Sequence, residues 1–137
     1  MKTFRHLFSL LFANNEKKRM AEQAILDTIP DDWAADIDQR QLKTMALLSR
    51  PSVIHGIAEQ LNIAPSKNLD ELVKKIAKAH NVSLKRELDA LEVTCINNAK
   101  IDLFTERYGH LFNADKNGYL SHSIPMLRKI TGMSLPG

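Results

Sequence analysis

The chain has 137 residues, of which 44% are hydrophobic and 26% are charged, and its formal net charge is +3. This length suits one domain, and this composition is typical of a folded protein rather than a disordered one. Charges of both signs are spread along the sequence, without the basic run that marks a nucleic-acid or membrane tail. The single cysteine, Cys95, cannot close an intramolecular disulfide. We therefore expect a reducing compartment, either the cytoplasm or a host cell into which a bacterium delivers the protein.

Residues 1–13 are predicted to form an amphipathic helix. Its apolar residues recur at steps of three and four, which places them on one helical face: Phe4, Leu7, Phe8, Leu11 and Phe12. The apolar run is too short to span a membrane. This face either completes the core of the domain or docks on a partner or a membrane surface. In the second case Phe4, Phe8 and Phe12 are the candidate partner-binding residues.

Two helices are expected before Pro51. The first covers residues 16–29, with Met20, Ala24, Ile25 and Leu26 expected to face inward, and the second opens at Pro30. The second carries these apolar positions: Trp33, Ile37, Leu42, Met45, Leu47 and Leu48. Pro51 is then expected to interrupt the chain, because proline removes a backbone donor from a helix.

Residues 52–80 are interpreted as two amphipathic helices joined by a short loop. The apolar row of the second helix is Leu69, Leu72, Val73, Ile76 and His80. Asn68 is its predicted N-cap, and Glu71 is placed to complete a capping box.

A long helix is predicted from Ser83, its N-cap, to about Tyr108, where Gly109 stops it. Residues 110–123 are rich in turn formers, and Pro125 opens a last short helix. The predicted fold is therefore all-α. We expect a compact irregular bundle of five to seven helices in a single domain over residues 1–137.

The segment IAEQLNIAPS, residues 57–66, resembles the front half of the helix-turn-helix units of bacterial transcription regulators, with the small Ala58 at the tight helix contact. The resemblance implies a DNA-binding regulator that uses residues 52–80. The lysines expected to contact phosphates are Lys67, Lys74 and Lys75. Beyond this segment the sequence departs from the family pattern, because Asn68 and Glu71 stand where apolar residues are expected.

The segment NADKNGYLS, residues 113–121, resembles the opening of an EF-hand calcium loop. The resemblance implies a calcium site with these candidate ligands: Asn113, Asp115 and Asn117. The twelfth loop position is Ile124 instead of the bidentate Glu of the family, so the expected affinity is weak.

The sequence contains no clear catalytic motif. The five histidines are far apart, and Cys95 lies in an apolar helical row. We therefore expect a non-enzyme without a cofactor or metal. The favoured interpretation is a small binding or regulatory protein that acts through another protein or by self-association. The alternatives are a DNA-binding regulator and a weak calcium site.

Overall fold

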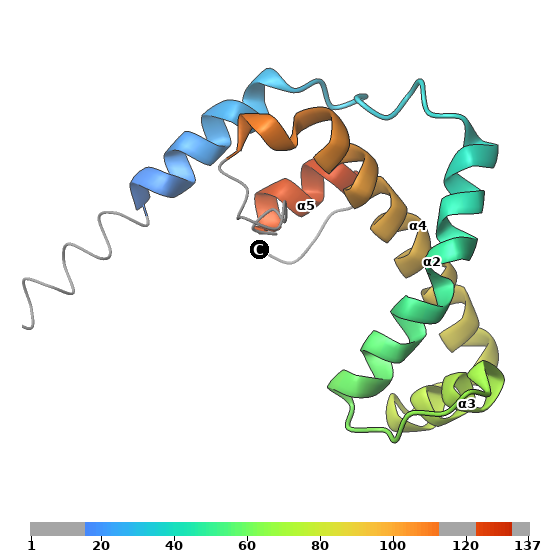
Figure 1. The fold of residues 1–137 in the computed structure, drawn as a ribbon. Helices are drawn as coiled ribbons and strands as arrows, with labels where there is room; N and C mark the ends of the chain where they lie inside the picture. The colour runs from blue at the N-terminus through green and yellow to red at the C-terminus, as the bar shows by residue number, and fades with distance from the viewer. Residues whose placement is uncertain (1–15, 113–122, 133–137) are drawn as a thin grey trace, which may run out of the picture. The chain divides into compact units, whose positions relative to one another are not determined.

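A computed structural model describes residues 16–112 and 123–132 of the chain. These residues form helices and turns and no strand, which confirms the all-α prediction for the described part (Figure 1). The elements are a helix over residues 16–28, α2 (Gln39–Gln60), α3 (Leu69–Ala79), α4 (Leu84–Tyr108), the 3-10 helix η1 (Gly109–Leu111) and α5 (Ile124–Thr131). The predicted helix over residues 1–13 and most of the turn-rich segment lie outside the described residues.

The chain divides into two compact units, and α4 contributes to both. The first unit contains the described residues 16–35, 104–112 and 123–132, and the second contains residues 36–103. The predicted single domain and the number of helices in a bundle stay predictions.

The core of the second unit is built by α2, α3 and α4. Its buried residues are Ala46, Ile54 and Ala58 of α2, Leu72, Val73 and Ile76 of α3, and Leu91 and Cys95 of α4. The apolar row predicted for α3 is thus confirmed at its three central positions. His80, which was predicted to end that row, is exposed. Its position just after the last turn of α3 places its ring against the Glu87 carboxylate.

Local capping signals set the beginnings of α3 and α4. The Asn68 side chain accepts a hydrogen bond from the backbone N–H of Glu71 at 3.2 Å, so the predicted N-cap is confirmed. The backbone N–H of Asn68 donates to Ser66 Oγ at 3.1 Å. In the predicted capping box the Glu71 side chain accepts this hydrogen bond, so Ser66 takes the role that was predicted for Glu71. At α4, Ser83 Oγ accepts from the backbone N–H of Arg86 at 3.2 Å. The predicted end of α4 at Tyr108 is also confirmed.

The predicted break at Pro51 is wrong, because α2 runs through this proline. Proline cannot donate to the carbonyl of Leu47, four residues earlier. Leu47, Leu48 and Pro51 are all exposed, so this side of α2 faces water, which can bond the orphan carbonyl. The same exposure shows that Leu47 and Leu48, which were predicted among the apolar positions of this segment, do not belong to the core. The buried residues of α2 instead lie at steps of four, eight and four residues, because Arg50 is only half-buried: Leu42, Ala46, Ile54 and Ala58.

The helix expected to open at Pro30 begins later. Residues 31–36 form turns, held by hydrogen bonds from Trp33 N–H to Pro30 O at 3.1 Å and from Ala35 N–H to Asp32 O at 2.9 Å. α2 starts only at Gln39, where the Asp38 side chain accepts from the backbone N–H of Arg40 at 2.9 Å.

Trp33 is buried in the first unit. Other buried residues of this unit come from the helix over residues 16–28 and its end, from α4 and from α5: Leu26, Ile29, Phe104, Met126 and Ile130. The Trp33 and Phe104 rings meet edge to face with their centroids 5.2 Å apart. Met20, which was predicted to face inward, is exposed.

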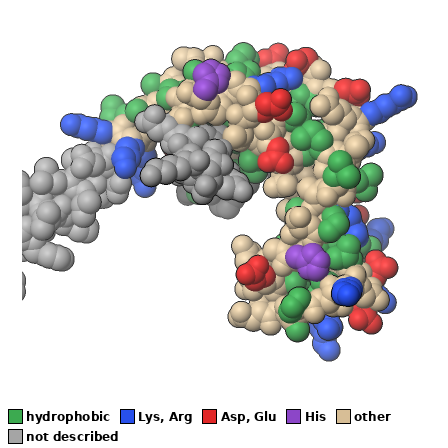
Figure 2. Space-filling model, viewed as in Figure 1, with side chains coloured by type: hydrophobic (Ala, Val, Ile, Leu, Met, Phe, Trp, Pro, Cys, Tyr) green, Lys and Arg blue, Asp and Glu red, His purple; other side chains and the backbone are tan. Residues whose placement is uncertain are grey.

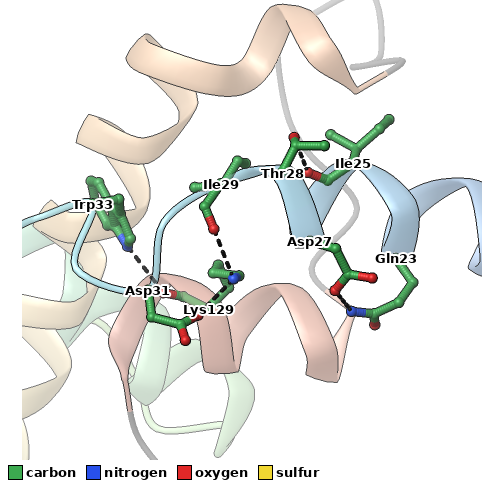
Figure 3. A network of polar contacts seen from close by, with 8 residues as sticks. All are labelled: Gln23, Ile25, Asp27, Thr28, Ile29, Asp31, Trp33 and Lys129. Atoms are coloured by element: carbon green, nitrogen blue, oxygen red, sulfur yellow. Dashed lines mark hydrogen bonds and ion pairs between the residues drawn. The ribbon is translucent and has the colours of Figure 1, made fainter.

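Polar contacts fasten α5 to the turn after residue 28 (Figure 3). Lys129 Nζ donates to Ile29 O at 2.9 Å and to Asp31 Oδ1 at 2.7 Å. Ser123 caps the N-terminus of α5, and Gly132 caps its C-terminus with a φ of 70°, the left-handed conformation that glycine adopts freely. The predicted last helix is therefore confirmed, with Ile124 and Thr131 as its ends.

Candidate functional site

An apolar groove runs between α2 and α4 of the second unit and has a volume of about 360 Å³. Its α2 wall consists of Lys43, Ala46, Leu47 and Arg50, and its α4 wall of Leu88, Leu91, Glu92, Cys95 and Ile96. Both sets follow the spacing of three and four residues that puts side chains on one helical face. The groove is therefore formed by two facing helical stripes.

Small side chains at its base keep this groove open. Ala46 and Cys95 are 7% and 4% exposed, and neither side chain is long enough to fill the space between the helices. At the edges, Leu47 is 69% exposed and Leu88 is 40% exposed. The groove thus presents leucine side chains to water above a buried base, an arrangement that suits the apolar face of a partner helix.

The charged residues of the groove differ between its two walls. Lys43 and Arg50 stand two helical turns apart on the α2 wall, and Glu92 stands on the α4 wall. A partner that places carboxylates near α2 and a basic group near α4 complements this arrangement.

Cys95 acts here as an apolar side chain. Burial raises the pKa of the Cys95 thiol, and the positive charge of Arg50 opposes this change to a smaller extent. The protonated thiol is a weak nucleophile. The interpretation of Cys95 as a small buried hydrophobic residue is therefore supported by its environment.

The predicted DNA-contacting lysines are all exposed: Lys67, Lys74 and Lys75. The connection between Gln60 and Leu69 covers residues 61–68, which is eight residues. A helix-turn-helix joins its two helices with about three or four residues. The geometry of residues 52–80 thus differs from that of the family at the turn itself. On the face shown in Figure 2, basic side chains alternate with acidic and hydrophobic ones over the described residues.

The other predicted site residues lie outside the described part of the chain: Phe4, Phe8, Phe12, Asn113, Asp115 and Asn117. Ile124, the twelfth position of the calcium-loop resemblance, is the first residue of α5 and carries no oxygen ligand. Within residues 16–112 and 123–132, no group of three or more His, Cys, Asp or Glu side chains is arranged to hold a metal ion. In the same residues, no helix combines the length and hydrophobicity needed to cross a bilayer.

The groove residues were not recognised as a site from the sequence. The sequence contained one indication of an exposed leucine at this position. Leu47 and Leu48 are adjacent and point about 100° apart on a helix, so a narrow apolar stripe cannot include both. The sequence did not show that both leucines stay outside the core.

Comparisons with known proteins give no relative for this chain. No protein-family model, no curated protein and no solved structure matches it.

Proposed function

We propose that this chain is a small non-catalytic binding or regulatory protein that acts inside a cell through another protein. The α2–α4 groove receives an amphipathic helix of that partner. The observation that supports this function is the groove itself, where Leu47 and Leu88 stand exposed above a buried base. Exposed leucines at the edge of a groove lose contact with water when a partner covers them, and each such burial favours binding.

The chemistry of the groove specifies the partner helix. Apolar side chains at steps of three and four residues fit between Leu47 and Leu88. Lys43 and Arg50 are seven residues apart, about 10.5 Å along α2, so two acidic residues separated by two turns on the partner can pair with them. Glu92 favours a basic residue on the opposite edge.

Two adjacent leucines of α2 provide a matched test. Leu47 lines the groove and Leu48 does not, although they are 69% and 76% exposed. Leu47→Asp should abolish partner binding, and Leu48→Asp should preserve it, because only the first change puts a carboxylate into the apolar contact. Both variants should keep the wild-type circular dichroism and unfolding midpoint, since neither side chain belongs to the core.

The measurement is an affinity capture from cells of the native host, with wild type and both variants as bait and quantitative mass spectrometry as readout. A protein enriched by wild type and Leu48→Asp and lost with Leu47→Asp supports the proposal. A set of captured proteins that is the same for all three baits contradicts it. Reversal of both basic residues, Lys43→Glu with Arg50→Glu, should weaken the same contact and tests the charge pattern.

The phenylalanine stripe of the N-terminal segment is proposed as a second contribution to the partner contact or to self-association. The three phenylalanines predicted to share one helical face would offer a large apolar surface: Phe4, Phe8 and Phe12. Phe8→Asp should reduce binding or dimer formation, measured by capture and by analytical ultracentrifugation. Ser9→Asp adds the same charge off the stripe and should leave both unchanged.

DNA binding is the alternative function. The exposure of Lys67, Lys74 and Lys75 favours it, since each lysine is accessible to phosphate. The acidic Asp70 and Glu71 at the start of α3 are also exposed and would repel phosphate there.

A further inference from the structure

A second hollow in the same unit lies among α2, α3 and α4 and has a volume of about 480 Å³. Its apolar lining includes Ile54 and Ile57 of α2, Val73 and Ile76 of α3, and Leu91 of α4. Four of these five side chains are buried, and Ile57 is half-buried, so the wall of the hollow is part of the core. A hollow of this size lies within the range of small-molecule sites, which are mostly apolar with a few polar groups.

A histidine–carboxylate pair lines this hollow. His80 Nδ1 contacts Glu87 Oε1, and both residues belong to the lining. Glu87 is 8% exposed and is the only charged residue among those described that is buried. A carboxylate accepts hydrogen bonds, so the imidazole donates through Nδ1 to Glu87, and Nε2 of the neutral ring is left as an acceptor.

Arg86 adds a permanent positive charge to the same lining. Its backbone N–H donates to Ser83 Oγ at 3.2 Å, which fixes its place in the first turn of α4. Its side chain is exposed, and the adjacent Glu87 is already paired with His80. The hollow thus combines an apolar wall with an exposed guanidinium and an imidazole.

The pair also has a structural effect, since it joins the end of α3 to the start of α4, where helix dipoles favour a cation and an anion respectively. That effect accounts for His80 and Glu87. It does not account for the apolar hollow beside them or for an arginine at its lining.

We infer that this hollow binds a small amphipathic anion, with its apolar body against the partly exposed Ile57 and Val82 and its carboxylate at Arg86. A single carboxylate matches the charge of Arg86, and a guanidinium binds a carboxylate through two parallel hydrogen bonds. This site and the helix-binding groove are proposed for different ligands, although Leu91 lines both.

The probe is decanoate, used below the concentration at which it forms micelles, with decanol and decylammonium as matched neutral and cationic molecules. Titration calorimetry and ¹H–¹⁵N spectra of the full chain should show one decanoate per protein, with shifts centred on α3 and the first turns of α4. Decanol should bind about tenfold more weakly and decylammonium more weakly still, because neither pairs with Arg86.

Three variants locate the site. Arg86→Gln should weaken decanoate binding about tenfold and leave decanol binding unchanged. Lys85→Gln removes the same charge from the neighbouring residue, which is exposed and does not line the hollow, and should change nothing. Ala90→Leu should abolish binding of decanoate and decanol, because this exposed lining residue then fills the hollow with a good helix former.

The inference is overturned if decanoate does not bind, if Arg86→Gln and Lys85→Gln have the same effect, or if Ala90→Leu leaves binding intact. Circular dichroism of each variant identifies any loss of fold. An Ala90→Leu protein that unfolds is replaced by Thr94→Leu, which changes another exposed lining residue of α4.

Discussion

The indole Nε1 of Trp33 donates a hydrogen bond to the backbone carbonyl oxygen of Lys129 across 3.0 Å, although the two residues are 96 positions apart in the sequence. Arg107 adds a second link, because its Nη1 donates to the Trp33 carbonyl at 2.9 Å and its guanidinium carbon lies 5.9 Å from the ring centroid. Trp33 therefore connects the turn after residue 30 with both α4 and α5.

Replacement of Trp33 should strongly destabilise the first unit. Trp33→Ala is expected to lower the free energy of unfolding by about 3–5 kcal/mol, because it leaves a cavity against Phe104. Trp33→Phe keeps much of the apolar burial and should cost less. Denaturant unfolding followed by circular dichroism measures both changes. A loss below about 1 kcal/mol for Trp33→Ala would contradict the central place of this residue.

The Asp31–Lys129 pair should make a small pH-dependent contribution to stability. The hydrogen bond from Lys129, together with its positive charge, holds the pKa of Asp31 below its ordinary value. A carboxyl group with a lowered folded-state pKa favours folding above its ordinary pKa, and this contribution is lost as the pH falls through the lowered value. Asp31 is exposed, so the effect on stability is small.

Carbon-detected NMR titration of the Asp31 carboxyl group tests this pair. Its pKa should rise toward the ordinary value in Lys129→Met and stay lowered in Lys75→Met, which removes an exposed lysine from the second unit. An unchanged Asp31 titration in Lys129→Met would show that Lys129 is not the cause.

Pro51→Ala should stabilise α2. Alanine restores the N–H that can bond the Leu47 carbonyl and has a much higher helix propensity, so the gain in unfolding free energy could reach about 3 kcal/mol. The side chain at residue 51 is exposed, so the change removes no core contact. Thermal unfolding provides the measurement. A lower melting temperature for Pro51→Ala would mean that the proline fits a bend that α2 needs.

Cys95 should be protected from alkylation in the folded protein. Its side chain is buried and its pKa is raised, so little thiolate is accessible to a reagent. Reaction with iodoacetamide at neutral pH should be slowed by roughly 100-fold or more relative to the protein in denaturant, because labelling requires local opening. Mass spectrometry follows the rate. Equal rates in both conditions would place the thiol on the surface.

The central pair of helices separates the DNA alternative from the favoured function. If residues 52–80 bind DNA, changing Lys67 and Lys74 together to Ala should lower the slope of affinity against salt by about two units. We expect instead no shift of random-sequence DNA at physiological salt. Heparin retention and mobility shifts across a salt series test this, and a salt-sensitive shift that the lysine changes abolish would favour the DNA-binding function.

The same double variant should leave stability nearly unchanged, because Lys67 and Lys74 are exposed. Leu72→Ala or Ile76→Ala should instead lower the unfolding free energy by about 2–5 kcal/mol, since both side chains are buried and each change leaves a cavity. This contrast keeps a binding defect distinct from a folding defect.

Local signals in the sequence determined much of the helical structure of the described residues. Asn68 and Ser83 mark the starts of α3 and α4 because caps act through the backbone of the nearest few residues. The row of Leu72, Val73 and Ile76 predicted the buried face of α3, since helical periodicity is a property of neighbouring residues.

Tertiary structure decided which apolar residues reach the core and where the surface is hollow. Pro51 predicted a break by the same local rules, yet α2 continues because that side of the helix faces water. Leu47 and Leu48 are as hydrophobic as Leu42, but no other part of the second unit buries them as Leu42 is buried. The groove beside Leu47 and the hollow beside Glu87 each require side chains from different helices, and a local sequence pattern does not specify which helices will face one another.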